Sequence, residues 1–313
     1  MADPEPTGEF GLIAWIRERV QAGRGVSQGI GDDCASLTFR AGAEVLVTTD
    51  MLMEGRHFLL HETTAAEVGY KALAVNLSDI ASMAGVPVAA FVAVALPRGS
   101  AVEVAQGLHA GMIPLLEKFG VTLAGGDTNA WDGPLVVTVT LIGEATDRGA
   151  VRRSGARPGD LIIVTGPLGG SLLGRHLRPT PRVAEALVLA EVVRLHAMID
   201  LSDGLAADLG HILEESGGLG ATLDALAIPI HPDARSLGGS PIDHALHDGE
   251  DFELCLTVSP DDADRLLASP PSGVTLHRIG TIEVEPGLRL RLADGSTRPL
   301  TPKGFDHLLG GAS

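Results

Sequence analysis

The stretch Thr64-Ala-Ala-Glu-Val-Gly-Tyr-Lys-Ala-Leu-Ala-Val-Asn-Leu-Ser-Asp79 carries the clearest structural signal in the chain. Thr64, followed three residues later by Glu67, matches a capping box, which places a helix start at Thr64. Apolar side chains then recur at helical spacing and form the buried stripe of this helix: Tyr70, Leu73, Leu77, Ile80 and Ala84. Gly85 is the expected C-terminal stop, and a strand follows as far as Pro97.

Asp79 is the only charged residue between Lys71 and Arg98, and it borders the apolar stripe. A carboxylate beside a core is costly unless a cation or hydrogen-bond donors compensate it. One interpretation is an ion pair with Lys71, which lies about two helical turns away and at the edge of reach. The other is a metal ion, with Asn76 on the same helical face. We favour the metal because other parts of the chain hold similar acidic groups.

Four further acidic clusters follow apolar runs or glycine-rich turns: Gly31-Asp-Asp33, Thr48-Thr-Asp50, Gly125-Gly-Asp-Thr128 and Asp200-Leu-Ser-Asp-Gly204. Short β-type runs are expected to present these acids at their ends. Alone, Gly-Asp-Asp is typical of a turn and Ser-Asp of a helix N-cap. Carboxylate and hydroxyl oxygens are also the hard ligands that Mg²⁺ selects, and bound Mg²⁺ usually bridges to substrate phosphates. Five clusters together predict several metal ions on a polyphosphate, and hence phosphoryl transfer.

A separate glycine-rich loop, Thr165 to Gly174, follows the apolar run Leu161–Val164. Its backbone N–H groups could cradle a phosphate at a helix start. It lacks the Gly-Lys-Ser/Thr ending of a P-loop and the spacing of a dinucleotide fingerprint. A tight strand-to-helix turn is an equally good interpretation.

Composition restricts the class of protein. The chain has 313 residues, 45% hydrophobic and 20% charged, which fits a soluble globular protein of two ordinary domains. Its net charge of −17 argues against nucleic acid as a partner. Cys34 and Cys255 are too few and too far apart for a disulfide framework or a zinc site, which favours reduced thiols in the cytoplasm. We expect no signal peptide and no membrane span.

The chain divides near residue 145. Before it we expect helix, strand, strand, helix, strand, helix and strand, the last running from Leu135 to Gly143. After a basic, turn-rich joint at 152–160, a second α/β unit is expected with strands near 161–165, 252–258 and 274–282 and helices near 183–195 and 204–215.

Several motifs resemble one known family. They are Gly29-Ile-Gly-Asp-Asp-Cys-Ala35, Thr48-Thr-Asp-Met51, Lys71–Asp79, Gly125-Gly-Asp-Thr128, Asp200-Leu-Ser-Asp-Gly-Leu205 and Gly249-Glu-Asp-Phe-Glu-Leu254. In this order they are similar to the thiamine-monophosphate kinases, of the superfamily of aminoimidazole ribonucleotide synthetase. The resemblance runs from Gly8-Glu-Phe10 to Lys303-Gly-Phe-Asp-His307.

The resemblance implies an α/β (α+β) protein of two domains. Residues 1–145 would bind ATP and Mg²⁺ and pair across a homodimer interface into a β-barrel, and residues 146–313 would pack helices on a mixed sheet. ATP and several Mg²⁺ ions would bind between the domains. The γ-phosphoryl group of ATP would pass directly to thiamine phosphate, giving thiamine diphosphate and ADP without a phosphoenzyme.

The resemblance also implies roles for single residues. Its metal positions match Asp33, Thr48, Thr49, Asp50, Asp79, Asp127, Asp200 and Asp203, with Asp32 acting through water or by orienting its neighbour. The nucleotide-contacting positions match Gly126, Asp127, Arg153 and Ser202. The acceptor side matches His57, Glu250 and Phe305. Without the resemblance, Arg153 reads as a surface arginine, Phe305 as a core aromatic and Glu250 as a solvated turn residue.

No dedicated nucleophile or general base is expected, because metal-assisted phosphoryl transfer depends on positioning and charge stabilisation. Two departures from the family stand out. The chain is shorter between Gly174 and Arg182, and phenylalanine replaces the common tyrosine at Phe252 and Phe305. Competing functions are an aminoimidazole ribonucleotide or selenophosphate synthetase, a non-catalytic nucleotide-binding protein and a Mg²⁺-dependent phosphatase.

Overall fold

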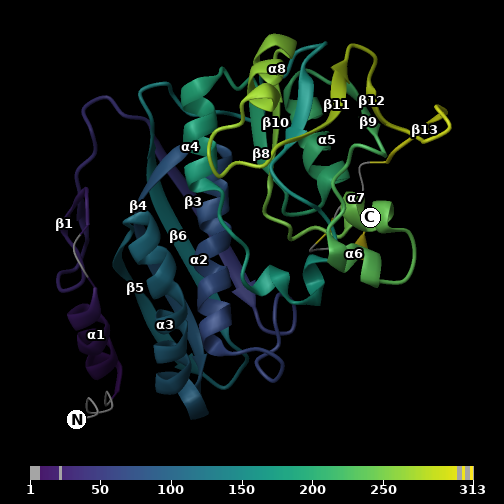
Figure 1. The fold of residues 1–313 in the computed structure, drawn as a ribbon. Coiled ribbons are helices and arrows are strands. Elements are labelled where there is room, and N and C mark those ends of the chain that lie inside the picture. The colour runs from purple at the N-terminus through teal and green to yellow at the C-terminus, as the bar shows by residue number, and fades with distance from the viewer. Residues whose placement is uncertain (1–7, 21–22, 302–304, 307–310, 313) are drawn as a thin grey trace. The chain divides into compact units, whose positions relative to one another are not determined.

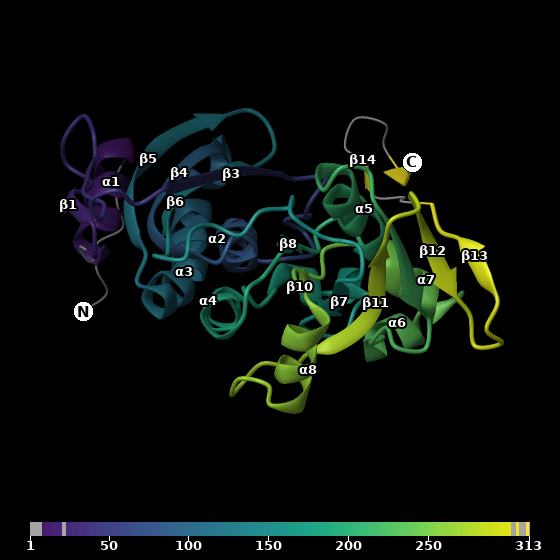
Figure 2. The same cartoon turned by 90° about the horizontal axis from the view of Figure 1, so that it is seen from above.

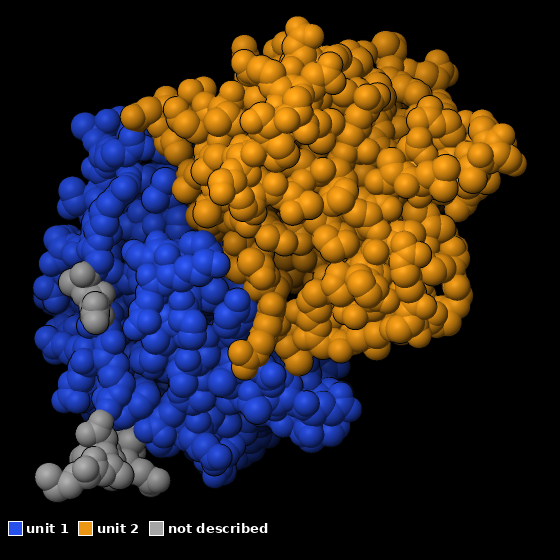
Figure 3. Space-filling model, in the orientation of Figure 1, with its two compact units in different colours: residues 1–80, 86–145 blue, residues 81–85, 146–313 orange. Residues whose placement is uncertain are grey.

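The computed structural model describes residues 8–20, 23–301, 305–306 and 311–312. Two compact units divide the chain, as the colours of Figure 3 show. The first holds residues 1–80 and 86–145, and the second holds residues 81–85 and 146–313. Among the described residues, none of the helices combines the length and the hydropathy needed to cross a membrane.

An open, mixed four-stranded sheet forms the centre of the first unit. Its order is β3 (Val45–Met53), β6 (Val136–Ala145), β4 (Gly85–Pro97) and β5 (Thr122–Trp131). Helices α2 (Ala65–Ser82) and α3 (Ala101–Phe119) lie side by side along one face (Figures 1 and 2), with the short η1 (Arg98–Ser100) before α3. Helix α1 (Gly8–Arg19) and the small β1–β2 pair (Val26–Gln28, Ser36–Leu37) lie beside β5 and α3.

The capping box at Thr64 is confirmed. The Glu67 backbone N–H donates to Thr64 Oγ1 over 3.2 Å, and the Thr64 N–H donates to Glu67 Oε2 over 3.0 Å. The predicted stop at Gly85 is wrong by one position. The residue with left-handed backbone is Ala84, at φ 51°, while Gly85 begins β4.

Two acidic motifs lie inside strands rather than at their ends or in turns. Strand β3 continues through Thr48 and Asp50 to Met53, and β5 continues through the Gly125–Asp127 motif to Trp131. Pairing explains the extension, because β6 binds every residue of β3 and β4 binds β5 in parallel. The backbone hydrogen bonds to these neighbouring strands extend β3 and β5 beyond the length that their polar side chains alone predict.

A seven-stranded mixed sheet forms the second unit. Its order is β13 (Thr297–Pro299), β12 (Gly287–Arg291), β9 (Gly220–Asp224), β11 (His277–Glu283), β7 (Leu161–Val164), β10 (Leu254–Val258) and β8 (Ala197–Asp200). The helices are η2 (Ser171–Leu173), η3 (Arg175–Leu177), α4 (Val183–Val192), α5 (Leu205–Glu215), α6 (Pro232–Ser236), α7 (Pro241–His247) and α8 (Pro260–Ala268). A last pair, β14 (Phe305–Asp306) and β15 (Gly311–Ala312), follows.

The core of this unit is built from apolar strands and one strongly amphipathic helix. Every residue of β7 and β10 is buried, so both faces of the sheet are covered. Helix α5 packs on one face through Leu205, Leu209 and Ile212. Its first residue directly follows the Asp200–Gly204 motif, so the core also fixes where that motif leaves the sheet.

Candidate functional site

In the first unit, β3 and α2 bring Thr48 and Asp79 together. The Thr48 hydroxyl donates to Asp79 Oδ2 over 2.5 Å. Asp50 lies two residues along on the same face of β3, opposite Val139, whose side chain is buried. Strand alternation therefore turns Thr48 and Asp50 towards the face that α2 covers.

Thr49 lies on the opposite face of the same strand. Its hydroxyl is 3.0 Å from the hydroxyl of Thr140, its partner on β6. The period of two in a strand separates consecutive side chains, so the side chains of Thr48 and Thr49 cannot both face Asp79.

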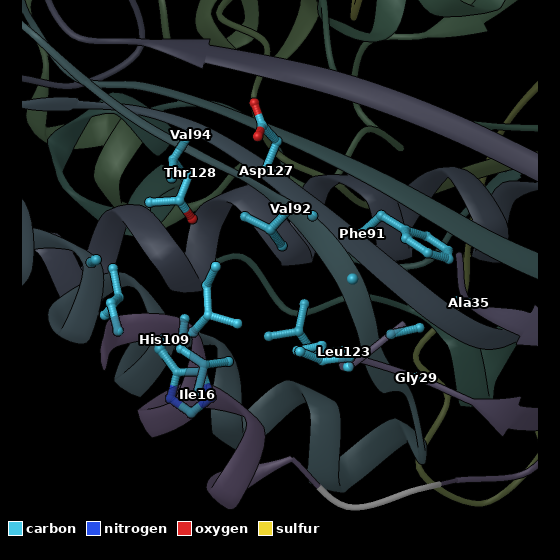
Figure 4. Close-up of a pocket in the computed structure, with 18 of the residues that line it drawn as sticks. Ile16, Gly29, Ala35, Phe91, Val92, Val94, His109, Leu123, Asp127 and Thr128 are labelled. Atoms are coloured by element: carbon cyan, nitrogen blue, oxygen red, sulfur yellow. The ribbon is translucent and has the colours of Figure 1, made fainter. Parts of the chain in front are cut away.

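A pocket of about 890 Å³ in the first unit joins two further motifs. The Gly29–Ala35 stretch lines it with Asp32 and Asp33, and β5 lines it with Gly125–Thr128. In Figure 4 the Asp127 carboxylate lies at one end of the labelled side chains, whereas Ile16, His109 and Leu123 lie at the other. The pocket thus has an acidic end and a mainly apolar end.

Local hydrogen bonds hold the acidic side chains that line the pocket. The Asp32 carboxylate accepts the backbone N–H of Asp33 over 2.9 Å. Asp127 Oδ2 accepts the side-chain amide of Asn129 over 2.7 Å. A Cβ on Gly126 would lie 1.9 Å from the carbonyl oxygen of Val92, so only glycine lets β5 approach β4 this closely.

Sequence reasoning missed His109 at the apolar end. Its side chain is 4% exposed, and its Nδ1 has no hydrogen-bond partner within the part of the chain that the structure describes. The Trp15 ring meets it edge-on, with centroids 5.3 Å apart. Burial, followed by the nearby Arg19 charge, lowers the pKa of His109, which keeps the imidazole neutral near pH 7.

In the second unit, the Asp200 and Glu250 motifs lie side by side. Asp200 pairs with Leu254 at the end of β8. Backbone bonds continue past that pair, from the Phe252 N–H to the Leu201 carbonyl at 2.8 Å and from the Glu250 N–H to the Ser202 carbonyl at 2.7 Å. Sheet pairing therefore brings two motifs about fifty residues apart into direct contact.

Asp208 is a further acid that the sequence reading missed. Its Oδ2 accepts the backbone N–H groups of Asp203 and Gly204 at 3.0 and 3.1 Å, and the side chain is buried. Burial first, and then the charges of Asp200 and Asp203, raise the pKa of Asp208 well above its usual value; the Asp203 N–H and Arg153 act against the rise. Arg153 itself is exposed.

The glycine-rich loop does not offer its central donors to a phosphate. The Gly169 N–H donates to the Asp251 carboxylate, at 3.1 and 2.9 Å from its two oxygens. The Gly170 N–H donates to Asp248 Oδ2 over 2.9 Å. The loop then enters the short 3₁₀ turn η2, as the turn interpretation expects. The phosphate-cradle interpretation is wrong for Gly169 and Gly170, because carboxylates accept their N–H groups.

The expected acceptor residues are placed as follows. His57 lies in the turn after β3, where its Nδ1 accepts the Met53 N–H over 3.0 Å and its carbonyl accepts the buried Lys71 ammonium over 3.2 Å. Glu250 has left-handed backbone at φ 52°. Phe305 belongs to β14, and its side chain lies outside the described part of the chain.

The residues present fit Mg²⁺ by their chemistry, since they offer carboxylate and hydroxyl oxygens. Among the described residues, no three His, Cys, Asp or Glu side chains gather closely enough to hold a metal by themselves. In proteins Mg²⁺ is usually held by one or two carboxylates together with waters and substrate phosphates.

Comparisons with known proteins agree with one family. The pattern of "AIR synthase related protein, N-terminal domain" matches residues 31–145, and that of the C-terminal domain matches residues 157–293. A thiamine-monophosphate kinase of Rhodopirellula baltica is 39% identical over 310 residues, covering 96% of this chain and 97% of the relative.

Solved structures extend the similarity. A thiamine-monophosphate kinase from Stenotrophomonas maltophilia superposes with a TM-score of 0.80 at 38% identity, covering 92% of this chain and 97% of the other. AaThiL complexed with AMPPCP and TMP superposes with a TM-score of 0.75 at 29% identity, covering 98% and 99%.

Proposed function

The chain belongs to the thiamine-monophosphate kinase family of the AIR synthase related proteins, and from this premise we propose that it uses ATP to phosphorylate thiamine phosphate. The observation that carries the proposal is similarity over nearly the full length to kinases of this name. The complex of AaThiL with AMPPCP, an ATP analogue, and TMP supports the same donor and acceptor. The products are thiamine diphosphate and ADP.

We assign the nucleotide to the pocket of the first unit. Gly126 and Asp127 lie at its acidic end, where triphosphate and metal would be held, and the apolar end between α1 and α3 suits a base. Arg153 and Ser202 of the second unit are proposed to contact the phosphates. The planar guanidinium of Arg153 can engage two phosphate oxygens at once.

Residues of both units are proposed to hold Mg²⁺: Asp33, Thr48, Thr49, Asp50, Asp79, Asp127, Asp200 and Asp203. When bound, Mg²⁺ would offset the repulsion between the phosphates and bridge their oxygens. Thr48 orients the Asp79 carboxylate through its hydroxyl, and Asp208 orients the Asp203–Gly204 turn through two N–H bonds. The Thr49 side chain faces away from Asp79, and its hydroxyl lies 3.0 Å from that of Thr140.

The acceptor needs little activation. A phosphate oxygen of thiamine phosphate is already ionised near neutral pH, so no general base or protein nucleophile is proposed. His57, Glu250 and Phe305 are proposed to hold the acceptor, with Glu250 opposite its cationic or amino groups. These three residues would orient the acceptor oxygen in line with the γ-phosphorus.

A direct assay tests the proposed function. Purified protein is incubated with ATP and Mg²⁺ and with thiamine phosphate, free thiamine or no acceptor. Equal amounts of ADP and thiamine diphosphate, formed only with thiamine phosphate, are expected. ADP without thiamine diphosphate would contradict the proposal and point to another acceptor.

We further propose that residues 1–145 are a dimerisation domain in a cytoplasmic homodimer with a shared β-barrel. One face of β3 supports this, because it exposes a row of apolar side chains: Val45 at 43%, Val47 at 63%, Met51 at 54% and Met53 at 44%. Exposed apolar side chains grouped on one face of an edge strand often mark an interaction site. A second copy of the same sheet would cover it.

Val47→Lys is expected to weaken this dimer, because it places a charge in the middle of the apolar row. Light scattering after gel filtration should give the 32.3 kDa mass of one chain for the variant and twice that mass for the wild type. Val188→Lys, at an exposed valine of α4, is the matched control and should leave the dimer intact. A wild-type protein that is monomeric at micromolar concentration would contradict the proposal.

A further inference from the structure

The segment Asp248–Glu253 has an unusual backbone. Gly249, Glu250 and Phe252 all have positive φ, at 72°, 52° and 51°. Glycine accepts such a conformation freely, but glutamate and phenylalanine do so at a cost in energy. A strained segment of this kind persists only where its surroundings hold it.

Backbone contacts hold the segment on one side. Glu250 and Phe252 donate their N–H groups to the carbonyls of Ser202 and Leu201. A Cβ on Gly249 would lie 2.7 Å from the Ser202 carbonyl oxygen, so the two motifs are in close contact there. These bonds fix the distance of the segment from the Asp200 motif.

Buried side chains hold the segment on the other side. Asp251, which is 7% exposed, accepts the Gly169 N–H and also accepts both terminal nitrogens of Arg175 at 3.1 Å. Arg175 in turn donates to the Gly169 carbonyl over 2.8 Å. Asp251, Gly169 and Arg175 therefore form a closed ring of hydrogen bonds.

Neighbouring charges complete this anchor. Glu253 accepts the Thr165 hydroxyl over 2.7 Å and binds Arg182 through both of its carboxylate oxygens. Burial raises the pKa of Asp251 to about 6, against the opposing effects of the Gly169 N–H and Arg175, so the carboxylate is ionised at neutral pH.

We propose that Asp251 is a positioning residue for the acceptor contact of Glu250. Its carboxylate ties the strained segment to Gly169 and Arg175, and this tie keeps the left-handed backbone that sets the direction of the Glu250 side chain. The inference rests on the proposed function, in which Glu250 contacts thiamine phosphate. It gives the glycine-rich loop a role as an anchor for the acceptor site.

Asp251→Asn keeps the side-chain size and an oxygen for the Gly169 N–H but removes the charge that faces Arg175. We expect the KM for thiamine phosphate to rise about tenfold, because the side chain that anchors the Glu250 backbone loses its charged contact with Arg175. The kcat and the KM for ATP should stay within about twofold, because only binding of the acceptor is altered. Asp264→Asn, at an exposed residue of α8, is the matched control and should change none of these values.

A double-variant cycle separates positioning from general destabilisation. If Asp251 acts through Glu250, then Glu250→Gln with Asp251→Asn should bind thiamine phosphate no more weakly than Glu250→Gln alone. Additive losses in the double variant, or an unchanged KM in Asp251→Asn, would overturn the inference. Arg175→Lys, which keeps the charge but loses the two-pronged contact, serves as a milder second variant.

Amide hydrogen exchange gives a readout that needs no substrate. The N–H groups of Glu250 and Phe252 should exchange at least about tenfold faster in Asp251→Asn, because the segment opens more often. Unchanged exchange would overturn the anchor even if activity fell. If the wild type has no kinase activity but Asp251→Asn still exchanges these N–H groups faster than the wild type, the proposed function is refuted and the anchor is supported.

Discussion

Replacement of Asp79 by asparagine is expected to leave a folded protein that has lost most of its turnover. Asparagine has the same shape, and its carbonyl can still accept the Thr48 hydroxyl that now binds Asp79 at 2.5 Å. What disappears is one negative charge of the proposed metal set. Because the Mg²⁺ held by such carboxylates would stabilise the charge on the phosphates in the transition state, we expect kcat/KM to fall at least about a hundredfold.

The measurement is formation of thiamine diphosphate as a function of Mg²⁺ concentration. Half-maximal activity should require more Mg²⁺ in Asp79→Asn, and the melting temperature should change by less than about 3 °C. Glu103→Gln, an exposed acid on α3, is the control for loss of one charge and should retain full activity. Near-normal activity of Asp79→Asn would remove Asp79 from the proposed metal set.

Replacement of Gly111 by alanine is expected to destabilise the first unit more than any surface change. A Cβ at Gly111 would lie 1.8 Å from the carbonyl oxygen of Ala66, and a Cβ at Gly69 would lie 2.1 Å from that of Leu108. The two helices α2 and α3 thus cross with backbone against backbone. Since a main-chain carbonyl cannot turn aside, the helices must separate, at a cost of about 3 kcal/mol or more.

The sign of this effect makes the test sharp. Alanine is a better helix former than glycine by about 1 kcal/mol, so Gly111→Ala would stabilise an open helix face. We expect instead that the melting temperature, measured by circular dichroism, falls by roughly 6–12 °C. Gly107→Ala on the same helix would place its Cβ 2.7 Å from the Cβ of Ala65, which is a smaller overlap, and should therefore cost less. Stabilisation by Gly111→Ala would contradict the close crossing.

Elements with local signals were predicted well. The start of α2 was read from Thr64 and Glu67, because a capping box is formed within one helical turn. The strand that delivers Asp200 and the helix that follows it were also predicted, since an apolar run and a helix N-terminus are local features. The family was recognisable because its motifs occur in a fixed order along the chain.

Residues with distant partners were missed. Asp251 and Gly169 lie far apart in the chain, and the sequence gives no sign that a carboxylate occupies the donors of the glycine-rich loop. Asp208 reads as an ordinary helix residue until its bonds to Asp203 and Gly204 are seen, although an acid on the apolar face of α5 was a usable signal. The extent of β3 and β5 was underestimated for the same reason, because their partners are other strands.

The sequence by itself determined the family and the positions of elements whose signals span a few residues. Capping and helical periodicity depend on residues close together in the chain, so they can be read without coordinates. Only the tertiary structure decided that Thr48 and Thr49 face opposite sides of a sheet, that Glu250 adjoins Ser202 and that Asp251 anchors Gly169. Strand register and buried ion pairs arise from pairing between distant segments, which no single stretch of sequence encodes.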